Sequence, residues 1–184
     1  MRIVGIDPGS RKAGFAIVEV QNRKLVHIAS GSIILNSEDP IPERLLVLFQ
    51  DLEEVFTKYK PQELAIENVF FAKNAQSALR LGQARGVVLL NAAKHLLEVF
   101  EYSPTEIKSS ICGSGRASKE QIQHMIRLLL GLHKNFQFAS PDQADALAIC
   151  LTHIQTRKTT NKWRKDDRLS DWQNSSKDTH AINH

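Results

Sequence analysis

Three segments rich in Val and Ile open the chain and follow one another with only short turns between them. They run from Arg2 to Ile6, from Ala13 to Val20 and from Lys24 to Leu35. The groups between them, Asp7-Pro8-Gly9-Ser10 and Gln21-Asn22, are typical of turns. Consecutive strands joined in this way predict an antiparallel meander, so the start of the chain is expected to form one side of a sheet.

Helices and strands are predicted to alternate after this meander. Apolar residues recur at spacings of three and four from Pro42 to Tyr59, which predicts an amphipathic helix. Leu64 to Val69 is predicted to be a short strand, Asn74 to Val99 a long helix that is apolar on more than one face, and Phe100 to Tyr102 a final strand. This order predicts an α/β fold with a mixed five-stranded sheet, in which three antiparallel strands and two further strands are flanked by helices. A ribonuclease H-like fold has this order of elements.

Three helix starts follow the last predicted strand. Each has a serine that can act as an N-cap, with Glu or Gln three residues later, and two of them have proline at the first helical position. The groups are Ser103-Pro104-Thr105-Glu106, Ser118 with Gln121, and Ser140-Pro141-Asp142-Gln143. We expect a helix to begin at each of these points.

The composition is that of a soluble globular protein. The chain has 184 residues, of which 42% are hydrophobic and 24% charged. No stretch approaches the roughly 20 consecutive apolar residues of a membrane span, and the first residues do not resemble a signal peptide. We therefore expect a cytoplasmic protein with no membrane contact. Cys112 and Cys150 are expected to be small buried residues rather than a disulfide or metal ligands.

The basic charge is concentrated near the C-terminus. The formal net charge is +4, and residues 155–184 hold seven Lys or Arg against four Asp. Few apolar residues occur there, so this part is not expected to form a core of its own. The predicted organisation is a ribonuclease H-like domain over residues 1–156 and a basic, flexible tail over residues 157–184.

Four carboxylates stand at the ends of predicted elements. Asp7 ends an apolar strand, Glu67 follows Leu64-Ala65-Ile66, and Asp142 and Asp145 lie three residues apart at the start of a helix. Each has an ordinary structural explanation when it is taken alone, for Asp is common in turns and acids are favoured in the first turn of a helix. If the four converge, they form an all-oxygen site suited to Mg²⁺ or Mn²⁺.

Several sequence motifs occur together in one known family. They are Gly5-Ile6-Asp7-Pro8-Gly9-Ser10-Arg11, Glu67-Asn68-Val69-Phe70, the block from Asn74 to Gly86, and Asp142 with Asp145-Ala146-Leu147-Ala148. With these motifs the chain resembles the RuvC family of bacterial Holliday-junction resolvases over roughly residues 1–155. The block from Asn74 to Gly86 is the most specific of them.

The resemblance implies a homodimer that binds a four-way DNA junction and nicks two strands of like polarity symmetrically, in recombination and repair. The RuvA–RuvB branch-migration complex is a further partner that it suggests. It assigns the catalytic and metal-binding roles to a quartet of carboxylates, which are Asp7, Glu67, Asp142 and Asp145. The quartet would hold two Mg²⁺ ions, for which Mn²⁺ can substitute. The resemblance also matches Phe70 to an aromatic residue that presses into the junction's bases, and Lys108 and Lys119 to basic residues near the scissile phosphate.

One departure from the family pattern lies on the second strand. The family usually has a Thr-Gly-aromatic-Gly run where this chain has Ala13-Gly14-Phe15-Ala16. The replacement of Thr by Ala13 removes a hydroxyl that we expect to lie near the metal site.

Three alternatives compete with the resolvase. A resolvase-like nuclease that processes ribosomal RNA shares the Gly-Ile-Asp-Pro-Gly start and the fold but lacks the block from Asn74 to Gly86. A junction-binding protein without catalytic activity is the non-enzyme alternative, against which the intact quartet argues. ATPases of the actin-like and sugar-kinase type have a similar first turn, but they need a second lobe, and this chain has neither that length nor a Walker loop.

Overall fold

Five strands form one mixed sheet in the computed structural model, which describes residues 1–22, 24–68 and 75–157. The strands are β1 (Arg2–Asp7), β2 (Lys12–Gln21), β3 (Lys24–Ile34), β4 (Glu63–Glu67) and β5 (Glu98–Tyr102). Their order is β3-β2-β1-β4-β5, with β1, β2 and β3 antiparallel and with β4 parallel to both β1 and β5. The predicted mixed five-stranded sheet is confirmed.

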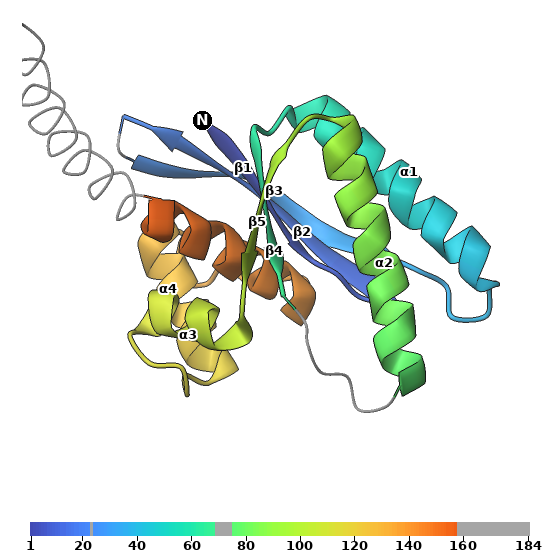
Figure 1. Ribbon diagram of the computed structural model, residues 1–184. Helices are drawn as coiled ribbons and strands as arrows, with labels where there is room; N and C mark the ends of the chain where they lie inside the picture. The colour runs from blue at the N-terminus through green and yellow to red at the C-terminus, as the bar shows by residue number, and fades with distance from the viewer. Residues whose placement is uncertain (23, 69–74, 158–184) are drawn as a thin grey trace, which may run out of the picture. The chain divides into compact units, whose positions relative to one another are not determined.

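Helices cover both faces of this sheet (Figure 1). One face carries α1 (Ile41–Tyr59) and α2 (Ala75–Lys94). On the other side of the sheet lie α3 (Pro104–Cys112), α4 (Lys119–Leu130) and a helix that begins at residue 141, drawn in orange. The structure describes this last helix as far as residue 157, and its residues up to His153 belong to the same compact unit as the sheet, Met1–His153.

Alternation along β1 divides its side chains between the two helical layers. Val4 and Ile6 lie in a core cluster with Leu48 and Leu52 of α1 and Val88 of α2. Gly5 faces the other layer, where a Cβ atom on it would lie 2.4 Å from the carbonyl oxygen of Ala146. Only glycine allows the helix over residues 141–153 to approach β1 so closely. Asp7 lies on this same face, two residues after Gly5.

The three predicted helix starts are confirmed. Ser103 and Ser118 each form a complete capping box with the residue three positions later. The start at Ser140 differs, because Gln143 Oε1 accepts a hydrogen bond from the backbone N–H of Ala139 (2.6 Å), not from that of Ser140. Gln143 Nε2 also donates to Ser30 Oγ (2.8 Å), so the cap ties the helix to β3.

Several predicted boundaries were wrong, most clearly the ends of two elements. The helix expected over Asn74 to Val99 ends at Lys94, and the chain reverses at Leu96, whose φ is 57°. Val99 is a strand residue of β5 that packs against the core, so apolar spacing continued where the helix did not. The strand expected to reach Val69 ends at Glu67, and Val69 lies outside the described residues.

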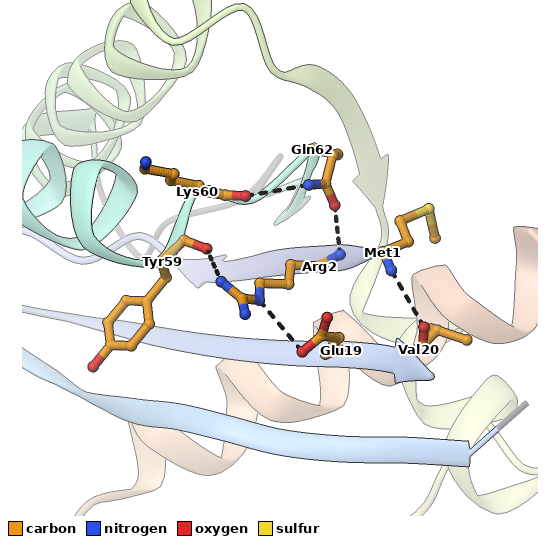
Figure 2. Close-up of polar contacts among 7 residues, drawn as sticks. All are labelled: Met1, Arg2, Glu19, Val20, Tyr59, Lys60 and Gln62. Carbon is orange, nitrogen blue, oxygen red and sulfur yellow. Dashed lines mark hydrogen bonds and ion pairs between the residues drawn. The ribbon is translucent and has the colours of Figure 1, made fainter. Parts of the chain in front are cut away.

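Polar contacts of Arg2 fix the beginning of β1 (Figure 2). Asp7 is the last residue of the same strand. The Arg2 guanidinium donates to the backbone carbonyl of Tyr59 (2.9 Å) and pairs with Glu19 of β2 (3.4 Å). Its backbone N–H donates to Gln62 Oε1 (2.6 Å). These contacts join α1, β2 and the approach to β4 around one strand end.

A row of buried polar side chains lies between the sheet and the helix over residues 141–153. His153 Nδ1 lies 2.6 Å from the Tyr102 hydroxyl, and His153 Nε2 lies 2.7 Å from Glu63 Oε2. The His153 side chain is 1% exposed and that of Glu63 6%, so these contacts satisfy polar groups that would otherwise be costly to bury.

The two cysteines differ in burial. Cys150 is fully buried, as predicted, whereas Cys112 is only half-buried. Among the described residues, none of the helices has the length and apolar character needed to cross a membrane.

Candidate active site

Asp7 and Glu67 end two neighbouring parallel strands. Ile6 of β1 is in register with Ile66 of β4, so the next residue of each strand lies at the same edge of the sheet. The carboxyl ends of parallel strands are a common position for functional groups in α/β folds. The sheet therefore brings together two carboxylates that are 60 residues apart in the sequence.

The helix that begins at residue 141 brings the other two carboxylates to the same edge. Asp7 pairs with Gly14 across β1 and β2, and a Cβ atom on Gly14 would lie 2.0 Å from the carbonyl oxygen of Asp142. Ser140 at the helix start shares a 2.6 Å hydrogen bond between hydroxyls with Ser32, the partner of Gly14 on β3. These contacts hold the first turn of the helix, with Asp142 and Asp145, beside Asp7.

The electrostatics show that the four side chains interact. Burial, followed by the charges of Glu67, Asp145 and Asp142, raises the pKa of Asp7 from 3.8 to about 8. Burial and then the charge of Asp145 raise the pKa of Glu67, and burial is also the main cause of a raised pKa at Asp145. Carboxylates that raise one another's pKa values in a partly buried site are characteristic of functional centres.

Lysines accompany the carboxylates. Lys119 Nζ lies 3.6 Å from Asp145 Oδ2, and the charges of Lys108 and Lys119 lower the pKa of Glu67 against the larger effect of its burial. Both lysines line a cavity of about 470 Å³ together with Glu67 and Asp145, and its remaining walls are mostly apolar. Six of the seven predicted site residues are thus in one region, and the seventh, Phe70, lies outside the described residues.

The donor set suits a hard divalent cation, because it consists of carboxylate oxygens. As the side chains stand, no group of three or more His, Cys, Asp or Glu among the described residues is arranged to hold a metal ion. Burial, and after it the charges of the three neighbouring carboxylates, raises the pKa of Asp7, and a divalent cation bound here would offset the negative charge of the group. The chemistry of the residues therefore fits Mg²⁺ or Mn²⁺.

Lys12 is a charged neighbour of the site that the sequence did not distinguish from other surface lysines. Its Nζ lies 3.6 Å from Asp142 Oδ2. Alternation along β2 could have indicated this position, because it puts Lys12 on the same face of the strand as Gly14, which packs against Asp142.

The expectation that Ala13 removes a hydroxyl beside the metal site was wrong. Ala13 points to the opposite face of β2 from Gly14 and is fully buried in the core cluster that α1 and α2 cover. Alternation places position 13 away from the carboxylates, so the site loses no hydroxyl there.

Comparison with known proteins assigns the family. The family profile described as "Crossover junction endodeoxyribonuclease RuvC" matches residues 3–153. The chain belongs to the RuvC family. A RuvC from Citrifermentans bemidjiense is 46% identical over 156 residues, covering 85% of this chain and 93% of the relative. One from Shewanella frigidimarina is 48% identical over 156 residues, covering 84% and 87%.

A solved structure supports the same assignment. The structure of Thermus thermophilus RuvC in complex with a Holliday junction substrate superposes with a TM-score of 0.80 at 31% identity, and the match covers 87% of this chain and 96% of that one. The fold of this RuvC-family chain is therefore the ribonuclease H-like fold predicted from its order of elements.

Proposed function

We propose that the chain is a divalent-metal-dependent endonuclease that acts as a homodimer and resolves four-way DNA junctions by paired nicks in strands of like polarity. The convergence of Asp7, Glu67, Asp142 and Asp145 at one edge of the sheet carries this proposal. Membership of the RuvC family and the junction bound by the Thermus thermophilus protein support the choice of substrate.

The quartet would hold two Mg²⁺ ions, with Mn²⁺ as a substitute. When bound, the ions supply electrostatic stabilisation to the attacking and leaving oxygens of the phosphodiester. Lys108 and Lys119 line the cavity beside Glu67 and Asp145, where their ammonium groups can contact phosphate oxygens of the cleaved strand. We assign Phe70 to stacking against bases at the junction, on the family resemblance alone.

A dimer follows from the symmetry of the reaction, since two symmetric nicks need two active sites and an isologous dimer supplies them. The exposed side of α2 is suited to such contact. Leu79 and Leu90 are 64% and 63% exposed, and Gly82 and Gly86 lie between them, where a Cβ atom added to either glycine would meet nothing within 4 Å. At 100° per residue these positions fall along one stripe, where small residues allow a second helix to approach closely.

One assay tests the function. Purified protein is incubated with a labelled four-way junction, with a matched duplex and with a structured RNA, in Mg²⁺, in Ca²⁺ and in chelator. We expect paired nicks in the junction alone and in Mg²⁺ alone, with Ca²⁺ supporting binding without cleavage because it prefers a larger and looser coordination shell. Full activity in chelator, or preferential cleavage of the RNA, would overturn the proposal. Adding the RuvA–RuvB complex tests that partner as a change in cleavage rate.

Variants then separate binding from cleavage. Asp7→Asn, Glu67→Gln, Asp142→Asn and Asp145→Asn should each abolish nicking, while junction affinity stays equal or improves as negative charge near phosphate is removed. Phe70→Ala should reduce cleavage with metal binding retained. Acid variants that still nick at near wild-type rates would show that these carboxylates are not the site.

A further inference from the structure

Lys12 forms an ion pair with one of the four site carboxylates. It is the first residue of β2, and its Nζ lies 3.6 Å from Asp142 Oδ2. The side chains of Lys12 and Asp142 are 36% and 29% exposed, so the ammonium group is open to solvent on one side. An approaching DNA strand can therefore reach it.

The backbone around Lys12 holds this pair in register with the site. A Cβ atom on Gly9, in the turn that follows Asp7, would lie 2.0 Å from the Lys12 carbonyl oxygen. On the other side, Gly14 packs against the carbonyl of Asp142. The backbone of Lys12 thus lies between the turn after Asp7 and the helix start at Asp142, which keeps the base of its side chain within reach of the Asp142 carboxylate.

The pair has a counterpart on the other side of the helix start. Lys119 of α4 lies 3.6 Å from Asp145 Oδ2, at the same separation as Lys12 from Asp142. Two lysines from different elements therefore flank the two carboxylates of the helix. Each ammonium group offsets negative charge, and each would repel a divalent cation bound to the same carboxylate.

We propose that Lys12 is a phosphate-binding residue of the cleavage site, which pairs with Asp142 in the free protein and exchanges this carboxylate for a DNA phosphate when the junction and a divalent ion bind. This inference rests on the proposed function. Lysine suits the exchange because its ammonium group is a compact charge on a flexible stem with three donors. Once a cation binds Asp142, a DNA phosphate beside the carboxylates can replace Asp142 as the anionic partner of Lys12.

The test compares Lys12→Gln with Lys58→Gln. Lys58 is an exposed lysine of α1, on the opposite face of the sheet, so the control removes the same charge away from the carboxylates. Ca²⁺ binding to each protein without DNA is measured by calorimetry, and junction affinity in Ca²⁺ is measured across a range of NaCl concentrations.

We expect Lys12→Gln to bind Ca²⁺ about 3- to 10-fold more tightly than wild type, because a competing cation is gone. We expect its plot of log affinity against log salt to be shallower by about 0.7 to 0.9, the value for one lost phosphate contact. Lys58→Gln should match wild type in both.

A double-mutant cycle gives an independent reading in chelator. Asp142→Asn frees Lys12, so it should increase junction affinity several-fold when Lys12 is present and by a smaller factor when Lys12→Gln is also present. Equal factors in the two backgrounds, an unchanged salt slope or unchanged Ca²⁺ affinity in Lys12→Gln would each overturn the exchange. Wild-type affinity for a matched duplex is measured alongside its affinity for the junction, so a failure of wild type to prefer the junction would count against the proposed function instead.

Discussion

Gly14 lies so close to Asp142 that a Cβ atom on Gly14 would stand 2.0 Å from the Asp142 carbonyl oxygen. The obstacle is backbone, which cannot rotate away as a side chain can. Gly14→Ala should therefore displace the start of the helix over residues 141–153 and with it Asp142 and Asp145. We expect a loss of stability of about 1 to 3 kcal/mol in urea unfolding and a larger fractional loss of nicking.

Gly31→Ala is the matched control for this variant. Gly31 lies on β3, and its added methyl group would meet only the ring of Phe15, at 3.0 Å, which can shift. Its cost should be smaller, and nicking per folded molecule should be retained. If Gly14→Ala and Gly31→Ala behaved alike, the close approach at Asp142 would not determine the position of the carboxylates.

The raised pKa of Asp7, about 8, makes the stability of the metal-free protein depend on pH. The folded state holds a proton on Asp7 that the unfolded state releases near pH 3.8, so the wild type loses stability as pH rises from about 4 to about 8. Asp7→Asn carries no such charge. In chelator the variant should be at least as stable as wild type at pH 8, with the difference vanishing towards pH 4, as measured by urea unfolding at several pH values.

Addition of Mg²⁺ supplies the control for the pH experiment. The cation should raise the unfolding midpoint of wild type at pH 8, because a ligand that binds only the folded state stabilises that state. It should have much less effect on Asp7→Asn, which lacks one of the carboxylates that would bind it. A wild type that gains stability as pH rises from about 4 to about 8 in chelator would contradict the raised pKa of Asp7 and the burial and repulsion that cause it.

Much of this arrangement could be predicted from the sequence, because it depends on local signals. The turn Asp7-Pro8-Gly9 marks the end of a strand, and the serine caps mark helix starts, so the residues at those ends were predictable. The ion pair of Lys12 with Asp142 was not, since it depends on the packing of β2 against a helix about 130 residues later. The end of α2 was missed for a related reason, because Leu96 adopts a left-handed conformation that apolar spacing does not reveal.

The Tyr102 hydroxyl should contribute to stability through His153. Tyr102→Phe removes the partner of His153 Nδ1 in a buried position, and leaving such a group unsatisfied costs about 1 to 3 kcal/mol. Urea unfolding should show a loss in this range. Tyr59→Phe is the control. Tyr59 accepts the hydrogen bond from Arg2 through its backbone carbonyl, which this substitution leaves in place (Figure 2). Equal losses in the two variants would show that the contact between Tyr102 and His153 adds nothing to stability.

The dimer surface proposed on α2 can be tested with two leucines of equal exposure. Leu90 of α2 is 63% exposed and Leu128 of α4 is 61% exposed, so replacing either by lysine costs the isolated subunit little. Burying a new ammonium group in a helix–helix contact is costly, however, so Leu90→Lys should shift the protein towards monomer while Leu128→Lys stays dimeric. Sedimentation at micromolar concentration measures the oligomeric state of both variants.

Because one junction needs two sites acting together, Leu90→Lys should also uncouple the paired nicks. A wild type that sediments as a monomer on the junction, or a Leu90→Lys dimer as stable as wild type, would place the contact elsewhere or remove it.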